Sequence, residues 1–309
     1  MMARWILRGV VAAAVSTVAT SAGIACTGDD PNLKPAGGAD ASGDVVVSGD
    51  GGLAGDATNL TDRDVDSATP AGTRRACEST PRLASTTGDR VLFEPYGILV
   101  DGTGTLVGWE ESITKRVAVP VDPGRAAKVT GCCLDIGVGE GLVYSHGPEL
   151  NVGTGYFSVY AQIKRVGTLP SAATGGSAIV KKPAAAFPFS GYALFVGQRD
   201  PDVGVLDSPA FQLRYAPQIS VESSTPVPGG GFLVVAGSRQ EDMRLRVGAD
   251  AQSRSRSMLD LIDLDNTEPL YLGGGGDNHF SGQLCAVVLN VGGETAFPER
   301  ATAIGALAH

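Results

Sequence analysis

Between Cys77 and His309 the apolar residues occur in short runs, and this pattern favours a β-rich domain. Runs such as RVLFEPYGILV, FSVYAQIKRV, GFLVVAGS and GQLCAVVLNV are bounded by turn-forming clusters, and the chain holds 43 glycines and 18 prolines. Short runs of β-branched and aromatic residues between such turns are typical of strands. The segment is long enough for one sizeable core. We therefore expect a single all-β domain over residues 76–309.

Several runs alternate with a period of two, which indicates strands with one buried face. In residues 157–164 the odd positions are Phe, Val, Ala and Ile, which we expect to face a core, and the even positions are expected to face outward. Residues 211–215 and 243–247 repeat the pattern. Only the tail FPERATAIGAL suits a helix, with Pro298 in its first turn. The prediction is a two-sheet antiparallel sandwich with a short C-terminal helix.

The N-terminus has the layout of a secretory signal peptide over residues 1–25. Arg4 and Arg8 precede the run GVVAAAVSTVATSAGIA, which is too rich in small residues for a convincing membrane span. Residues 23–26, Gly-Ile-Ala-Cys, resemble the lipobox of bacterial lipoproteins, although Leu is usual where Gly23 stands. That resemblance implies lipidation of Cys26 and anchoring in the cell envelope, in the outer membrane or at the cell surface. Ordinary secretion with cleavage after residue 25 is the alternative.

Residues 26–75 read as an acidic, disordered linker. From 27 to 72 the chain has nine aspartates against Lys34 and Arg63, and no aromatic residue. Such a composition buries too little apolar surface to offset its ordering entropy. We expect a tether that holds the folded domain away from a membrane. Most of the net negative charge lies here, and the remaining domain has no basic face of the kind that nucleic acid requires.

The chain has five cysteines, an odd number for an exported protein. If Cys26 carries a lipid, Cys77, Cys132, Cys133 and Cys285 remain as disulfide candidates. A bond between the neighbours Cys132 and Cys133 is strained, so we expect Cys77 and Cys285 each to bond one of them. The alternative is that some are buried thiols.

The C-terminal sequence PLYLGGGGDNHFSGQLCAVVLNVGGETAFPERATAIGALA resembles the closing segment of laminin G-like domains in the concanavalin A-like lectin/glucanase superfamily. The likeness extends over about residues 131–307 and implies a jelly-roll sandwich. Gln162 and Phe232 stand where Trp is usual, and residues 246–248 replace the usual Tyr-Val-Asn-Gly turn. The matching positions are Phe280, Gly282, Ala286, Val287, Leu289, Glu299 and Arg300.

Catalytic patterns are not evident in the sequence. Glycosidases of this superfamily place carboxylates at the spacing E-x-D-x-x-E, whereas Glu110-Glu111 and Glu241-Asp242 are adjacent and point to opposite faces of a strand. Asp263 and Asp265 alternate with apolar residues, as on a solvated face. His146 and His279 lie in Gly-rich turns without further ligands at metal-binding spacing. We therefore expect a protein that is not an enzyme.

Three sets of residues are candidates for ligand contact. The resemblance implies a Ca²⁺ site near the rim, for which Asp200, Asp202 and Asp207 are candidates, and a polar turn is the alternative. Trp109 is either a core residue, which we favour, or a sugar-stacking platform. Pairing across GADAQ could gather four arginines into a patch for an acidic polysaccharide, and a soluble exposed hairpin is the alternative. These are Arg244, Arg246, Arg254 and Arg256.

The sequence thus predicts a non-catalytic envelope lipoprotein that presents a laminin G-like recognition or adhesion module. Its expected ligand is a glycan or another envelope protein. Two alternatives remain: a structural surface protein without a ligand, and a polysaccharide hydrolase whose site is not recognisable.

Overall fold

A computed structural model describes residues 72–166, 177–183, 190–197, 208–214, 219–223, 226–249, 252–275, 278–292 and 297–307. The predicted signal peptide, Cys26, nearly all of the predicted linker and the three candidate calcium ligands lie outside these ranges. Within the described part of the chain, no helix has the length and apolar character needed to cross a bilayer.

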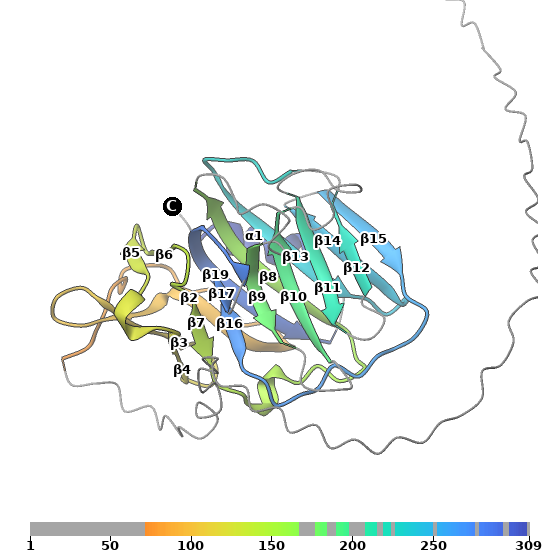
Figure 1. Cartoon of the computed structure of the whole chain (residues 1–309), viewed down its shortest axis with the longest axis horizontal. Helices are drawn as coiled ribbons and strands as arrows, with labels where there is room; N and C mark the ends of the chain where they lie inside the picture. The colour runs from red at the N-terminus through yellow and green to blue at the C-terminus, as the bar shows by residue number, and fades with distance from the viewer. Residues whose placement is uncertain are drawn as a thin grey trace, which may run out of the picture. The chain divides into compact units, whose positions relative to one another are not determined.

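The described chain is almost entirely β-structure (Figure 1). Its elements in order are β1 (Arg74–Arg75), β2 (Asp89–Val100), β3 (Leu106–Glu111), β4 (Val117–Pro120), η1 (Pro123–Arg125), β5 (Lys128–Thr130), β6 (Cys133–Ile136), β7 (Leu142–Tyr144), η2 (Pro148–Leu150), β8 (Phe157–Arg165), β9 (Ser177–Lys182), β10 (Gly191–Val196), β11 (Pro209–Arg214), β12 (Ile219–Glu222), β13 (Phe232–Arg239), β14 (Arg244–Ala249), β15 (Gln252–Ser257), β16 (Leu270–Leu272), β17 (Gly274–Gly275), β18 (Asn278–His279), β19 (Gly282–Val291) and α1 (Phe297–Gly305).

Apart from the separate β17–β18 pair, the strands form two facing layers that are joined into one antiparallel sheet. One layer runs β15-β14-β13-β8-β19-β2-β3-β4, with β6 and β5 continuing from the first residues of β19. The other layer runs β12-β11-β10-β9-β16-β7-β4. Because β4 pairs with both β3 and β7, the arrangement is nearly barrel-shaped. The predicted all-β class and C-terminal helix are confirmed, whereas the joined layers are closer to a barrel than to the predicted two-sheet jelly-roll sandwich.

The core lies between the layers, and the inward positions of β8 are the ones that the alternation predicts. Phe157, Val159, Ala161 and Ile163 are all buried in the main cluster. The expected exposure of the opposite face of β8 is partly wrong, because Tyr160 and Gln162 are buried too. A second layer of chain covers that face, which a period-two pattern cannot reveal.

Helix α1 provides much of that cover, lying over β8 and β13 on the side away from β9, β10 and β11 (Figure 1). Small residues such as Ala236 and Ala286 allow it to pack closely, and Ile304 is fully buried against them. The amide Nε2 of Gln162 donates to the Gly305 carbonyl at 3.1 Å. Gln162 thus satisfies a carbonyl that the end of the helix leaves open.

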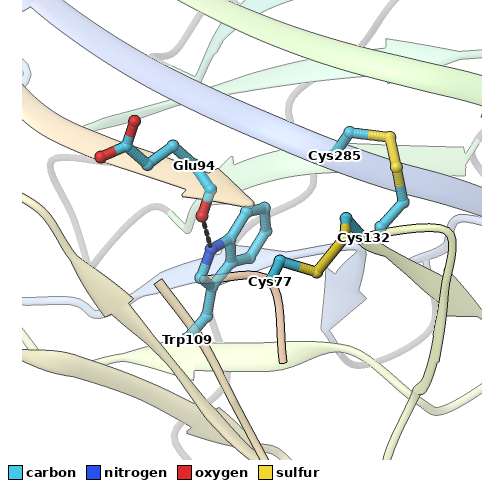
Figure 2. Close-up of a disulfide and its surroundings, with 6 residues drawn as sticks. Cys77, Glu94, Trp109, Cys132 and Cys285 are labelled. Atoms are coloured by element: carbon cyan, nitrogen blue, oxygen red, sulfur yellow. Dashed lines mark hydrogen bonds between the residues drawn. A yellow bond between two sulfur atoms is a disulfide. The ribbon is translucent and has the colours of Figure 1, made fainter. Parts of the chain in front are cut away.

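Two disulfides join the start of the domain to its central strand. Cys77 bonds Cys132, with Cα atoms 5.7 Å apart, and Cys133 bonds Cys285 of β19, with Cα atoms 4.3 Å apart (Figure 2). Gly131 and Cys132 have φ angles of 56° and 61° and form the two-residue loop between β5 and β6. Two consecutive positive φ angles are the signature of a type I′ hairpin turn, and at this turn the adjacent cysteines reach different partners.

Candidate binding surface

Trp109 is a core residue, so its candidacy as a stacking platform is wrong. Its side chain has no solvent exposure, and its Nε1 donates to the Glu94 carbonyl at 2.7 Å (Figure 2). Its ring packs against Phe93 with centroids 5.3 Å apart. A buried indole requires such an acceptor, and the β2 backbone supplies it here.

The four candidate arginines do not share one face, so the reading of them as one basic patch is wrong. In the β14–β15 pairing, Arg254 lies opposite Val247 and Arg256 opposite Leu245, both of which are buried in the core. Directly opposed residues project from the same face of a sheet. Arg244 and Arg246 therefore project from the other, outer face. The pairing was anticipated, but its register places two arginines on each face.

Arg254 and Arg256 remain solvent-exposed and reach from β15 to β12 of the other layer. Arg254 Nη1 lies 3.5 Å from the carbonyl oxygen of Glu222, and Arg256 Nη1 lies 3.1 Å from that of Ser220, both on β12. On the outer face, Arg244 forms an exposed ion pair with Asp242 at 3.2 Å. The four arginines are therefore divided between two faces, and Arg244, Arg254 and Arg256 contact other parts of the chain.

Two fully buried carboxylates hold local backbone. Glu94 accepts from the Leu83 backbone N–H at 2.6 Å and from Ser112 Oγ at 2.6 Å. Glu111 accepts from the Leu92 and Ile113 backbone N–H groups, both at 2.8 Å. In the described ranges, no group of three or more His, Cys, Asp and Glu side chains is placed to hold a metal ion. The calcium prediction concerns Asp200, Asp202 and Asp207, which lie outside those ranges.

A buried lysine lies at one end of the space between the layers. Lys182 has no exposed surface, and its Nζ donates to Asn151 Oδ1 at 3.3 Å and to the Asn266 carbonyl at 2.9 Å. Burial lowers its pKa to about 8, and the nearby Asp265 and Glu268 carboxylates oppose that effect. The sequence analysis missed Lys182, although the run SAIVKKP places one of its two lysines inward by alternation.

His146 and Tyr144 belong to the same end. His146 Nδ1 is buried and has no hydrogen-bond partner. Burial lowers the pKa of His146, and the charge of Lys182 adds to that effect. The Tyr144 hydroxyl donates to Glu149 Oε1 at 2.9 Å, and burial raises its pKa. Most of these polar groups have partners within the chain, so we assign them mainly a role in stabilising this end of the domain.

A more accessible set of side chains crosses the outer face of the β13-β8-β19-β6-β5 region. Here Phe232 lies opposite Lys164, Lys164 opposite Gln283, Gln283 opposite Asp135, and Asp135 opposite Lys128. We call these five residues the outer row. Phe232 is 36% exposed, Lys128 is exposed, and the other three are half-buried.

The sequence neighbours of the outer row establish its orientation. Each member is adjacent along the chain to an apolar residue that lies in the main core or packs against it. Because successive residues of a strand point to opposite faces, the row itself lies on the side away from the core. Alternation alone marks each residue as outward, but only strand register brings the five into one line. The core residues concerned are Leu233, Ile163, Leu284, Leu134 and Val129.

The comparisons with known proteins leave the family open. No family model matches the sequence, and no curated protein matches it significantly. Among solved structures, Trypanosoma rangeli sialidase in complex with sialic acid aligns with a TM-score of 0.48 at 15% identity, over 74% of this chain and 35% of the sialidase. Domain 4 of an extracellular GH43 arabinanase from Geobacillus stearothermophilus, in complex with arabinotriose, gives 0.45 at 14% identity, over 73% of this chain and all of that domain.

A third similar structure is a CBM40 module of a Ruminococcus gnavus sialidase bound to α2,3-sialyllactose. It aligns with a TM-score of 0.38 at 10% identity, over 54% of this chain and 92% of the module. These neighbours are carbohydrate-binding or glycan-acting β-proteins. Similarity at this level does not indicate what the present chain binds.

Proposed function

We propose that this protein is a non-catalytic envelope lipoprotein whose β-domain recognises a glycan through the outer row. The observation that carries the proposal is an exposed aromatic ring, Phe232, in line with four polar side chains on the outer face, beside the part of that face where α1 packs. Aromatic rings offer apolar faces to sugar rings, and ammonium, amide and carboxylate groups bond sugar hydroxyls. The row combines both kinds of contact.

We further propose that the domain has no hydrolytic activity. Glu94 and Glu111, the two carboxylates buried in the β2–β3 region, are engaged by backbone N–H groups, and this supports a structural role for them. We also propose a laminin G-like variant of the concanavalin A-like fold in which β4 joins the layers. The order of glycine-rich turn, β19 and α1 with its buried Arg300 supports that assignment.

Attachment to the envelope is proposed through Cys26, on an acidic tether at the outer membrane or cell surface. The pairing of the other four cysteines supports an oxidising compartment. Cys26→Ser should move the protein from the membrane fraction to the soluble fraction and abolish incorporation of labelled palmitate. A variant that still sediments with membranes, together with a parent that never takes up palmitate, would contradict lipidation.

A glycan array tests recognition directly. The parent protein should bind at least one class of glycan, and Phe232→Ala should weaken that binding at least about fivefold, because the stacking surface is lost. Leu259→Ala is the matched control, since Leu259 is 92% exposed elsewhere on the surface. Arrays with calcium and with chelator examine the predicted site at Asp200, Asp202 and Asp207. A blank array would instead favour a purely structural surface protein or an envelope-protein ligand.

A further inference from the structure

The length of the outer row and its direction across the strands limit the shape of the ligand that it can bind. Its five members come from five strands that lie side by side in the sheet, and each step along it is a direct cross-strand pair. Neighbouring strands lie about 4.8 Å apart, so the row extends about 19 Å across the sheet. It therefore runs perpendicular to the strands, and a ligand that contacts all five residues must be extended.

The polar members of the row are not engaged within the domain. Among the described residues, Lys164, Gln283, Asp135 and Lys128 have no hydrogen bond or ion pair with another side chain or with the backbone outside the strand ladder. The one close contact is the Lys164 ammonium, which lies 5.3 Å from the centroid of the Phe232 ring. Because these ammonium, amide and carboxylate groups have no such partners within the domain, their hydrogen-bond donors and acceptors are available to a ligand.

The charge of the row argues for an uncharged ligand. Two lysines flank one aspartate and one glutamine, so an anionic polymer would meet the Asp135 carboxylate between the two ammonium groups. Hydroxyl groups both donate and accept, and they can therefore bond every polar member of the row. The Phe232 ring at one end provides the single apolar contact.

The surroundings of the row keep its spacing fixed. On one side the next residues along the strands, including Gln162 and Ala286, are covered by α1. The Cys133–Cys285 disulfide joins β6 to β19 two residues away from Asp135 and Gln283. The middle of the row is thus held by a covalent link, and one flank of it is bounded by the helix.

We propose that the outer row binds a linear, uncharged, β-1,4-linked oligosaccharide laid across the strands, with one end on Phe232 and the other at Lys128. An extended β-1,4-linked chain advances per sugar by about the distance that separates neighbouring strands, roughly 5 Å. Successive sugars can therefore meet successive members of the row. This inference rests on the proposed glycan recognition and specifies its ligand class.

Calorimetry with β-1,4-linked N-acetylglucosamine oligomers of two to six sugars provides the test. Affinity should rise with each added sugar up to four or five and then level off. Phe232→Ala should weaken the binding of every length. Lys128→Ala should weaken the longest oligomers about fivefold to tenfold and leave the disaccharide unchanged, because only long chains reach that end. Arg90→Ala, at an exposed position on β2, is the control, and unchanged melting temperatures establish that the variants fold.

Four results would overturn the inference. Affinity that does not change from two to six sugars would exclude an extended site. If Lys128→Ala weakens the binding of the disaccharide and of the longest oligomer equally, the disaccharide does not bind at the Phe232 end, and the proposed placement is excluded. Failure of all these oligomers to bind, while the array identifies a charged or branched glycan, would refute the ligand class and leave the proposed recognition function standing. An array on which the parent protein binds no glycan would refute both the ligand class and the proposed glycan recognition.

Discussion

Replacing Cys133 and Cys285 together with alanine is expected to lower the free energy of unfolding by about 4–5 kcal/mol. The disulfide spans 152 residues, and the entropy that a cross-link removes from the unfolded chain grows with the loop that it closes. Cys285 has no exposed surface and lies in β19, which pairs with β8 on one side and with β2 and β6 on the other. Alanine leaves no buried hydroxyl there, so the loss reports mainly the cross-link.

The matched control is the double replacement of Cys77 and Cys132. That disulfide spans 55 residues and ties the first described segment to a hairpin turn, so a smaller loss of about 3–4 kcal/mol is expected. Urea unfolding of both variants and of the parent, with and without reductant, measures the difference. A Cys133/Cys285 variant that unfolds at the same urea concentration as the parent would refute the role of this link. So would a larger loss in the control variant.

The sequence was sufficient for features that depend on local pattern. Period-two alternation identified Phe157 and Val159 as core residues of a strand, and the composition of the tail identified α1. It could not identify β4 as the strand that joins both layers, because Val117–Pro120 is short and its partners β3 and β7 are set by tertiary packing. Local pattern indicates that a residue is in a strand, and not which strands lie beside it.

The candidate site depended on register, which is where sequence reasoning failed. A patch of Arg244, Arg246, Arg254 and Arg256, considered beside a soluble exposed hairpin, requires a shared face, yet a register that opposes Arg254 to Val247 separates them. A one-residue change of register exchanges the faces of every side chain in a strand. The outer row was missed for the same reason, since Phe232 and Lys128 are about 100 residues apart and meet in one line only through three intervening strands.

Arg239 is another residue that the sequence did not single out, and its contacts predict a large effect. It is the last residue of β13, and its guanidinium is almost fully buried. Its Nε donates to the Gly155 carbonyl at 2.7 Å, Nη1 to Ile262 at 2.6 Å and Nη2 to Gly153 at 2.7 Å. It also lies 5.1 Å from the Phe157 ring centroid. One side chain thus satisfies carbonyls of two segments that close the same end of the domain.

Burial lowers the pKa of Arg239 to about 10, so the group stays charged at neutral pH. Asp263 and Asp265 oppose that shift by their charge, although the hydrogen-bond partners of the guanidinium are backbone carbonyls. Removing a buried cation in this setting leaves several acceptors without donors, each at a cost of about 1–3 kcal/mol where water cannot replace the bond.

Arg239→Met keeps most of the side-chain volume and is expected to lower the free energy of unfolding by about 3–5 kcal/mol. The free energy of unfolding of Arg239→Lys should lie between those of Arg239→Met and the parent. An ammonium group carries three donors and cannot reach both segments with the geometry of a guanidinium. Arg244→Met on the neighbouring strand is the control, since its ion pair with Asp242 is exposed and should contribute less than about 1 kcal/mol. Hydrogen exchange adds a local measurement: amides near Gly153 and Ile262 should lose protection in Arg239→Met before those of β19 do. Equal stability of the two methionine variants would mean that these carbonyls find other partners, and that the end of the domain is held by Lys182 and its neighbours instead.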